Sequence, residues 1–69
     1  MTESILNEND SAASIKRLRK EILGMTQMQL AERLEVAYPT VNRWENGKNI
    51  PSRLIWEKLL KLEAEHFKE

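Results

Sequence analysis

A short helix with a strong start signal, followed closely by a second helix, is the feature of this 69-residue chain that most limits its fold. The first of the two is expected over residues 27–34. Thr26 precedes it and Gln29 follows three positions later, so each side chain can bond the other residue's backbone amide in a capping box. Leu30 and Leu34 lie four residues apart and give this helix one apolar face.

The second helix is expected over residues 38–45, after a short turn. At roughly 100° per residue, Val41 and Trp44 fall close together on one side of it and would face the core. The small Ala31 of the preceding helix would let the two helices cross closely, and Val36 would fill the corner between them. Two helices joined in this way form a helix-turn-helix, whose second helix can enter the major groove of DNA.

The opposite side of this second helix carries side chains that are free to meet a partner. They are Tyr38, Pro39, Asn42 and Arg43, with Thr40 at the edge. Pro39 is tolerated because the first-turn amides of a helix have no partner inside it, and it makes Tyr38 a candidate for the cap position. Arg43 is the strongest candidate for base contact, since a guanidinium can bond two guanine acceptors.

Another helix is expected on the N-terminal side of this pair. Its apolar residues recur at three- and four-residue spacing: Ile15, Leu18, Ile22 and Leu23. We expect this helix over residues 11–23, capped by Asp10 or Ser11 and ended by Gly24 in the left-handed conformation. Residues 1–10 are polar and acidic without periodicity, which predicts a disordered tail.

The last helix is expected over residues 52–67, with Ser52 as its cap. Its apolar residues are Leu54, Ile55, Trp56, Leu59, Leu60 and Leu62. This set is wider than one stripe, so it either closes the core from several sides or includes an interface. The whole pattern predicts an all-α fold, a compact bundle of four or five helices containing a helix-turn-helix.

Composition excludes several classes of protein. The chain has no Cys and a single His, His66, which leaves no disulfide framework and no thiolate or histidine zinc site. It has no apolar stretch of membrane-spanning length and no signal-peptide layout, so we expect a cytoplasmic protein without a membrane partner. We find no nucleophile with a base, no paired carboxylates and no metal-ligand set, and we therefore expect no enzyme and no metal or cofactor.

The charges of the chain are balanced in number but not in position. There are 11 basic and 11 acidic residues, and the formal net charge is zero. Residues 11–53 hold eight basic residues against four acidic ones, an excess of four positive charges around the predicted helix-turn-helix. This excess is modest, so we expect non-specific DNA affinity to be weak and sensitive to salt.

Several of these residues, taken in register, resemble a known family. They are Thr26, Gln27, Leu30, Ala31, Val36, Thr40, Val41, the run from Arg43 to Lys48, Pro51 and Ser52. They are similar to the helix-turn-helix domain of the lambdoid phage repressor and Cro family, also called the XRE family. The resemblance covers roughly residues 15–62. It implies a lambda repressor-like helical bundle that binds operator DNA as a dimer, usually to repress transcription.

The resemblance also implies roles for individual residues. Those that match positions facing base edges are Tyr38, Pro39 and Arg43, with Thr40 and Asn42 close by. Those that match positions holding phosphates are Gln27, Asn46 and Lys48. Tyr38 has an equally good alternative role, packing over the end of its helix.

Glu45 matches an acid that pairs with an arginine of the first helix. Arg19 is our choice for that partner. The run from Arg19 to Gly24 is one residue longer than usual for the family, so Lys20 or Arg17 could take the same place.

The sequence therefore predicts a sequence-specific double-stranded DNA-binding protein, a prokaryotic or phage regulator that represses transcription by occluding an operator, as a homodimer and without a small-molecule ligand. The alternative is a protein-interaction module on the same scaffold, such as an antitoxin or an adaptor, that docks through its last helix. Salt dependence of duplex binding separates the two, because only phosphate contacts release counterions.

Overall fold

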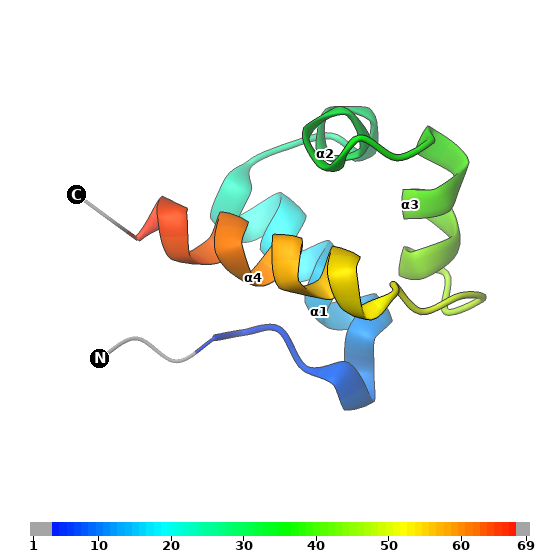
Figure 1. Ribbon diagram of the computed structural model, residues 1–69, viewed down its shortest axis with the longest axis horizontal. Coiled ribbons are helices and arrows are strands. Elements are labelled where there is room, and N and C mark those ends of the chain that lie inside the picture. Colours follow the sequence, from blue (N-terminus) through cyan, green and yellow to red (C-terminus); the bar gives the residue numbers. More distant parts are fainter. Residues whose placement is uncertain (1–3, 68–69) are drawn as a thin grey trace.

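The computed structural model describes residues 4–67, and over this range the chain is all-helical (Figure 1). A single 3-10 turn, η1 (Glu8–Asp10), leads into the first helix. The elements that follow are α1 (Ser11–Arg17), its π-helical continuation η2 (Leu18–Leu23), α2 (Gln27–Leu34), α3 (Tyr38–Glu45) and α4 (Arg53–His66). The predicted all-α bundle is confirmed, with four α-helices among residues 4–67.

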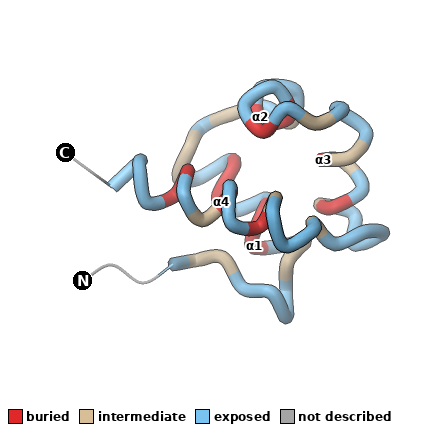
Figure 2. Tube along the Cα trace, viewed as in Figure 1, coloured by how far each residue is buried: buried red, intermediate tan, exposed pale blue. Residues whose placement is uncertain are grey.

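One apolar core lies between these helices (Figure 2). Its buried residues come from α1, η2 and all three later helices: Ile15, Leu18, Leu30, Ala31, Leu34, Val41, Trp44, Trp56, Leu59 and Leu62. Most of the wide apolar set of α4 closes this core, because Ile55 and Leu60 also pack against it. Leu54 is the exception, at 65% exposed.

Residues 4–10 run along α4 and are held there by specific contacts (Figure 1). The backbone amide of Ile5 donates to Oε2 of the buried Glu63 at 2.8 Å, and Ile5 and Leu6 pack against the core. The amide of Asn7 donates to Oγ of Ser14 at 3.2 Å. The predicted disordered tail is therefore wrong for residues 4–10, and residues 1–3 lie outside the described part. These contacts join residues up to 58 positions apart, which local periodicity does not reveal.

The start signals that the sequence offered are mostly present. The capping box of α2 is confirmed: Thr26 Oγ1 accepts from the amide of Gln29 at 3.0 Å, and Gln29 Oε1 accepts from the amide of Thr26 at 2.9 Å. Ser52 caps α4 through the amide of Ile55. Of the two candidates for α1, Asp10 holds the cap position without a side-chain hydrogen bond.

The start of α3 differs from our expectation. Its cap is Ala37, and Tyr38 is its first helical residue, so the suggestion that Tyr38 is the cap is wrong. The reason is that the first turn closes on the carbonyl of Ala37, which accepts from the amide of Thr40 at 3.0 Å. Pro39 occupies the first turn, where its missing amide costs nothing.

The turn between α2 and α3 contains a strained residue. Glu35 ends α2 with φ of +61°, a left-handed conformation that no other non-glycine residue among 4–67 adopts. We expect Glu35→Gly to stabilise the fold by about 0.5–1 kcal/mol. Glycine removes a backbone strain of about 1–2 kcal/mol, and its greater conformational entropy in the unfolded chain cancels part of that gain. Urea unfolding measures this change.

The matched control is Glu32→Gly, inside α2. It is expected to destabilise by about 1 kcal/mol, since glycine weakens a helix interior. A loss of stability in Glu35→Gly as large as in Glu32→Gly would contradict the strain at residue 35.

Candidate nucleic-acid interface

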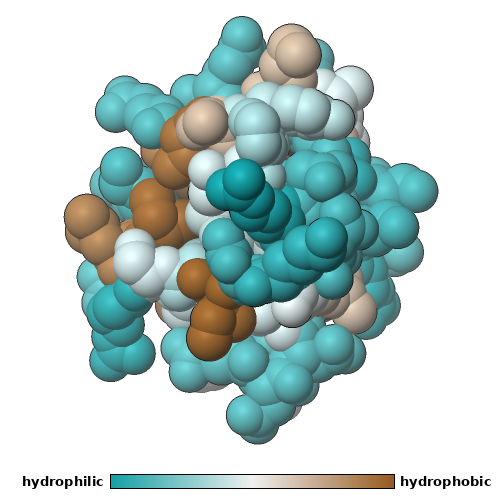
Figure 3. Space-filling model, turned by 90° about the vertical axis from the view of Figure 1, so that its right-hand side faces the viewer, coloured by the Kyte–Doolittle hydropathy of each residue, from teal (hydrophilic) through white to brown (hydrophobic). Residues whose placement is uncertain are grey.

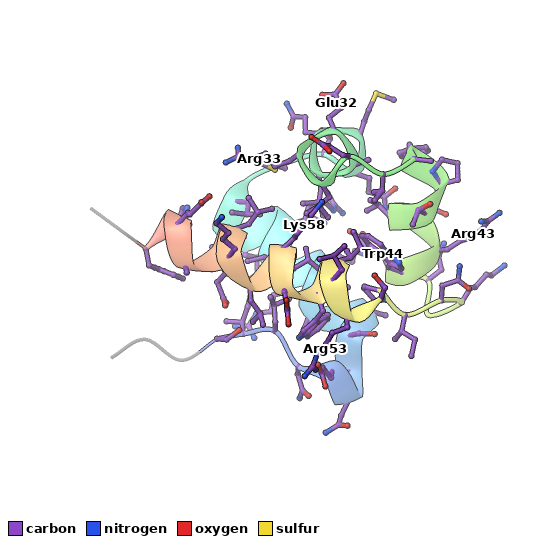
Figure 4. The ribbon with its side chains drawn as sticks, in the orientation of Figure 1. Glu32, Arg33, Arg43, Trp44, Arg53 and Lys58 are labelled. Atoms are coloured by element: carbon purple, nitrogen blue, oxygen red, sulfur yellow. The ribbon has the colours of Figure 1, made fainter. Side chains whose placement is uncertain are left out.

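The two sides of α3 have opposite surroundings. Val41 is fully buried and Trp44 is 3% exposed, and both belong to the core. Arg43 points away from the body of the molecule while Trp44 points into it (Figure 4). Tyr38 and Pro39 are also exposed. The helix is therefore held by one flank, and the other is exposed at Tyr38, Pro39 and Arg43.

The turn before α3 fixes how this helix crosses α2. The amide of Val36 donates to the carbonyl of Ala31 at 3.0 Å, and that of Glu35 donates to the carbonyl of Glu32 at 3.2 Å. Val36 is half-buried against the core, as the sequence predicted. Ala31 is buried and belongs to the core, where a larger side chain would overpack it.

The end of α3 is anchored by a buried ion pair with the first helix. Arg19 Nε donates to Glu45 Oε2 at 2.6 Å, and Arg19 Nη2 donates to Glu45 Oε1 at 2.9 Å. The two side chains are only 10% and 3% exposed. Our choice of Arg19 is confirmed: Arg17 pairs instead with Glu21 on the surface, and Lys20 is exposed.

The π-helical segment η2 explains how Arg19 reaches this place. A π-helical turn accommodates one more residue than an α-helical turn. Here the amides of Gly24 and Met25 both donate to the carbonyl of Arg19, a geometry that would accommodate the extra residue that the resemblance implies between Arg19 and Gly24. Gly24 then ends the segment with φ of +63°, and Arg19 Nη1 donates to the carbonyl of Met25 at 2.9 Å. Leu18 and Arg19 both remain buried.

Three amide side chains continue from this ion pair across α2 and α3. Gln27 Nε2 donates to Glu45 Oε1 at 2.9 Å. Asn42 Nδ2 donates to Gln27 Oε1 at 3.1 Å, and Asn46 Nδ2 donates to Asn42 Oδ1 at 2.9 Å. We call the series Gln27, Asn42, Asn46 the amide chain. It ties the start of α2 to the second half of α3.

The amide chain was not foreseen from the sequence, although all three of its members were candidate site residues. One link carries a local signal, because Asn42 and Asn46 are four residues apart on a helix, where amide side chains can bond each other. The links through Gln27 span 15 and 18 residues and depend on how α2 and α3 cross. Asn42 is half-buried as a result, whereas we expected it on the free side.

The remaining candidates lie on the surface around α3. Arg43 and Lys48 are exposed, and within residues 4–67 neither takes part in an ion pair. The amide of Lys48 donates to the carbonyl of Arg43 at 2.9 Å, so the loop after α3 folds back onto the helix end. Thr40 is half-buried. The face that carries α3 is mainly hydrophilic, with separate hydrophobic spots (Figure 3).

Other kinds of site find little support in the described residues. Residues 4–67 contain no group of three or more His, Cys, Asp or Glu side chains that could hold a metal ion. Among the helices of that range, none has the length and apolar character needed to cross a bilayer.

Comparison with protein families gives this geometry a context. The sequence model of the HTH_3 family, described as helix-turn-helix, matches residues 15–62. The chain belongs to the HTH_3 helix-turn-helix family. The match runs from Ile15 in α1 to Leu62, a core residue of α4, and it contains every candidate site residue. Comparisons with curated proteins and with solved structures gave no match.

HTH_3 domains are the XRE type of helix-turn-helix, similar to lambda repressor and Cro, and the resemblance noted in the sequence is confirmed. Membership supports a DNA-binding function of the transcription-regulator type. The family is typically non-enzymatic.

Proposed function

We propose that this HTH_3 protein is a sequence-specific double-stranded DNA-binding regulator of a prokaryote or phage, acting in the cytoplasm, and that it represses transcription by occluding an operator. The observation that carries the proposal is the division of α3 into a buried flank and a free flank. Trp44 and Val41 hold the helix in the core, so the flank with Arg43 can enter a major groove without unfolding anything (Figure 4).

The distribution of unpaired charge supports the same surface. Of the eight basic residues in 11–53, four form ion pairs with carboxylates: Arg17, Arg19, Arg33 and Arg53. The other four form none within the described residues: Lys16, Lys20, Arg43 and Lys48. Two of these free cations lie on or directly after α3, where phosphates flank a helix in the major groove.

We assign the candidate residues as follows. Those proposed to face bases are Tyr38, Pro39 and Arg43, with Thr40 and Asn42 close by. Those proposed to hold phosphates are Gln27, Asn46 and Lys48. Arg43 and Lys48 have the strongest support, because they are exposed and unpaired within residues 4–67. Gln27 and Asn42 have internal partners and would offer DNA only the amide hydrogens and the oxygen lone pairs that those bonds leave over.

A dimer would complete this mechanism. Two copies on DNA would place their α3 helices about 34 Å apart, one turn of the duplex, and would match a near-palindromic operator. Selection of bound duplexes from a random pool tests the proposal directly. Two half-sites at that spacing support a dimer, and a pool without enrichment contradicts sequence-specific binding.

One observation favours the alternative of a protein-interaction module. Ile50, in the loop before α4, is 73% exposed, and Leu54, in the first turn of α4, is 65% exposed. Such side chains could dock an antitoxin's or adaptor's partner protein. Duplex binding measured at several salt concentrations decides between the two functions: a steep fall with salt supports phosphate contacts, and no binding at any salt concentration supports the module.

Replacing Arg43 by alanine is expected to weaken binding to the selected duplex by about 1–3 kcal/mol and to relax the preference at one base pair. The reason is that a guanidinium bonds two acceptors of one guanine, and alanine bonds neither. Fluorescence anisotropy with the selected duplex and its single-base variants measures both effects.

The control is Lys48→Ala, which is expected to weaken binding to all these duplexes alike and to lower the salt slope by about one. If Arg43→Ala behaves in the same uniform way, Arg43 contacts phosphate and the base-reading role is excluded.

A further inference from the structure

Glu45 stands at one end of the amide chain, and both of its carboxylate oxygens accept hydrogen bonds from Arg19. An ionised carboxylate only accepts hydrogen bonds, while each amide side chain has one oxygen that accepts and one nitrogen that donates. Arg19 only donates, so its bonds to Glu45 leave the carboxylate as an acceptor for everything else that reaches it. Whatever Gln27 presents to Glu45 must therefore be its nitrogen.

The same match of donor to acceptor then fixes the orientation of each residue of the amide chain in turn. With its nitrogen on Glu45, Gln27 turns its oxygen to Asn42, which must donate. Asn42 then turns its own oxygen to Asn46, which must donate in turn. Reversing any single amide would bring two oxygens or two NH₂ groups together at the observed separations of 2.9–3.1 Å.

We infer that Glu45 fixes the direction of the amide chain, and that Gln27 and Asn42 are positioning residues that lock α3 against α2 in one orientation. The chain starts at a buried ion pair and ends at the exposed Asn46, so it carries a fixed polarity from the core to the surface. Asn42 acts through Gln27 on the angle of α3, and Arg43 beside it is left to read bases. Only this last consequence rests on the proposed function.

The sharpest test is Gln27→Glu, which replaces one donor by an acceptor with almost no change in shape. The carboxylate introduced at position 27 would face Glu45 with oxygen against oxygen and could not donate. Because an unsatisfied, charged pair of this kind is costly, we expect the folding equilibrium constant at pH 7 to fall about 10- to 100-fold. Urea unfolding followed by circular dichroism measures it.

Gln29→Glu is a control that changes the same atoms two residues away on the same helix turn. Gln29 uses its oxygen, which accepts from the amide of Thr26, and a glutamate accepts there equally well. Both variants add one negative charge near the N-terminus of α2, where the helix dipole favours it. We expect Gln29→Glu to stay within about twofold of the parent, and equal effects of the two variants would overturn the inference.

Exchanging the two partners provides a rescue. In Gln27→Glu with Glu45→Gln, the nitrogen of residue 45 can donate to the carboxylate of residue 27, and Asn42 still finds an oxygen to bond. Arg19 Nη2 loses its bond to Oε1 of residue 45, but the single Glu45→Gln variant already loses one Arg19 bond, so this loss is counted in the single effects. The double variant also keeps the net charge. We expect it to fold at least about tenfold better than the sum of the two single effects predicts. Simple additivity would overturn the proposed facing of residues 27 and 45.

The role of Asn42 is tested with DNA. Asn42→Ala is expected to weaken binding of the selected duplex and of its single-base variants by a similar factor, unlike Arg43→Ala, once binding is corrected for the folded fraction. A changed base preference would make Asn42 a reader and overturn its positioning role. If the parent binds no duplex at all, the proposed function fails, while the unfolding measurements still decide the direction of the chain.

Discussion

Replacing Glu45 by alanine is expected to leave most of the protein unfolded at 25 °C. The substitution removes the carboxylate opposite Arg19, whose side chain is only 10% exposed, and leaves that charge buried without its partner. Breaking a buried pair in this way costs about 3–5 kcal/mol. A domain of this size has about 3–5 kcal/mol of stability in total, so the loss is comparable to the whole. Gln27 also loses the acceptor that orders the amide chain.

Circular dichroism at 222 nm with urea titration measures the effect, and a surface ion pair provides the control. Arg17 and Glu21 pair at 3.4 Å with side chains 62% and 66% exposed. Glu21→Ala is expected to cost at most about 0.5 kcal/mol, because solvent screens such pairs. If both variants lose equally little, the burial of the Arg19 pair does not contribute as argued.

Removing both charges of the buried pair shows how much of the loss in Glu45→Ala comes from leaving the charge of Arg19 without a partner. Arg19→Met with Glu45→Met leaves no isolated charge in the core, and paired apolar replacements of buried ion pairs are often neutral. Here two polar groups lose their partner, since Gln27 Nε2 donates to Glu45 and the carbonyl of Met25 accepts from Arg19. We therefore expect the double variant to be more stable than Glu45→Ala and less stable than the parent.

The features that could be predicted from the sequence are those that depend only on residues a few positions apart. The capping box at Thr26 needs only Gln29 three positions later, and both bonds are present. Val41 and Trp44 share a side of α3 because of helical geometry alone, and both are buried. The same holds for Gly24 at the end of its helix. Local chemistry of this kind fixes which elements form and which side of each faces inward.

The features that could not be predicted depend on how distant segments meet. Ile5 bonds Glu63 across 58 residues, so a polar N-terminal sequence that looks disordered in isolation is ordered by α4. The π-helical segment keeps both Leu18 and Arg19 buried before Gly24, although the apolar spacing there is also compatible with a regular α-helix. Gln27 meets Asn42 only because α2 and α3 cross at one particular angle. Periodicity contains no information about these separations.

For the candidate site the same division applies. The exposure of Arg43 followed from its place on the helix opposite Trp44, and the pairing of Glu45 with Arg19 followed from the family resemblance. The internal bonds of Gln27 and Asn42 did not follow from either, because an amide can serve the protein or the DNA equally well. Which of the two it serves is decided by the carboxylate beside it.

Replacing Trp44 by alanine is expected to cost about 3–5 kcal/mol, the range for removing a large aromatic side chain from a core. Trp44 is 3% exposed and lies among buried residues of the other helices, so no solvent or flexible side chain can readily fill the space that it leaves. Because α3 is held in the core by Trp44 and Val41, this loss falls on the element that carries the proposed DNA-reading flank. Urea unfolding followed by circular dichroism is the measurement, since the substitution itself removes one of the two tryptophans that fluorescence would report.

The neighbouring residue supplies the matched control, because one step along α3 leads from the core to solvent. Arg43→Ala is expected to change the free energy of unfolding by no more than about 0.5 kcal/mol, as exposed positions without partners usually do. The two adjacent variants therefore have opposite profiles: Trp44→Ala loses the fold, and Arg43→Ala keeps the fold and loses discrimination among duplexes. Should Arg43→Ala unfold the protein as Trp44→Ala does, Arg43 would be part of the packing of α3, and that flank would not be free to enter a groove.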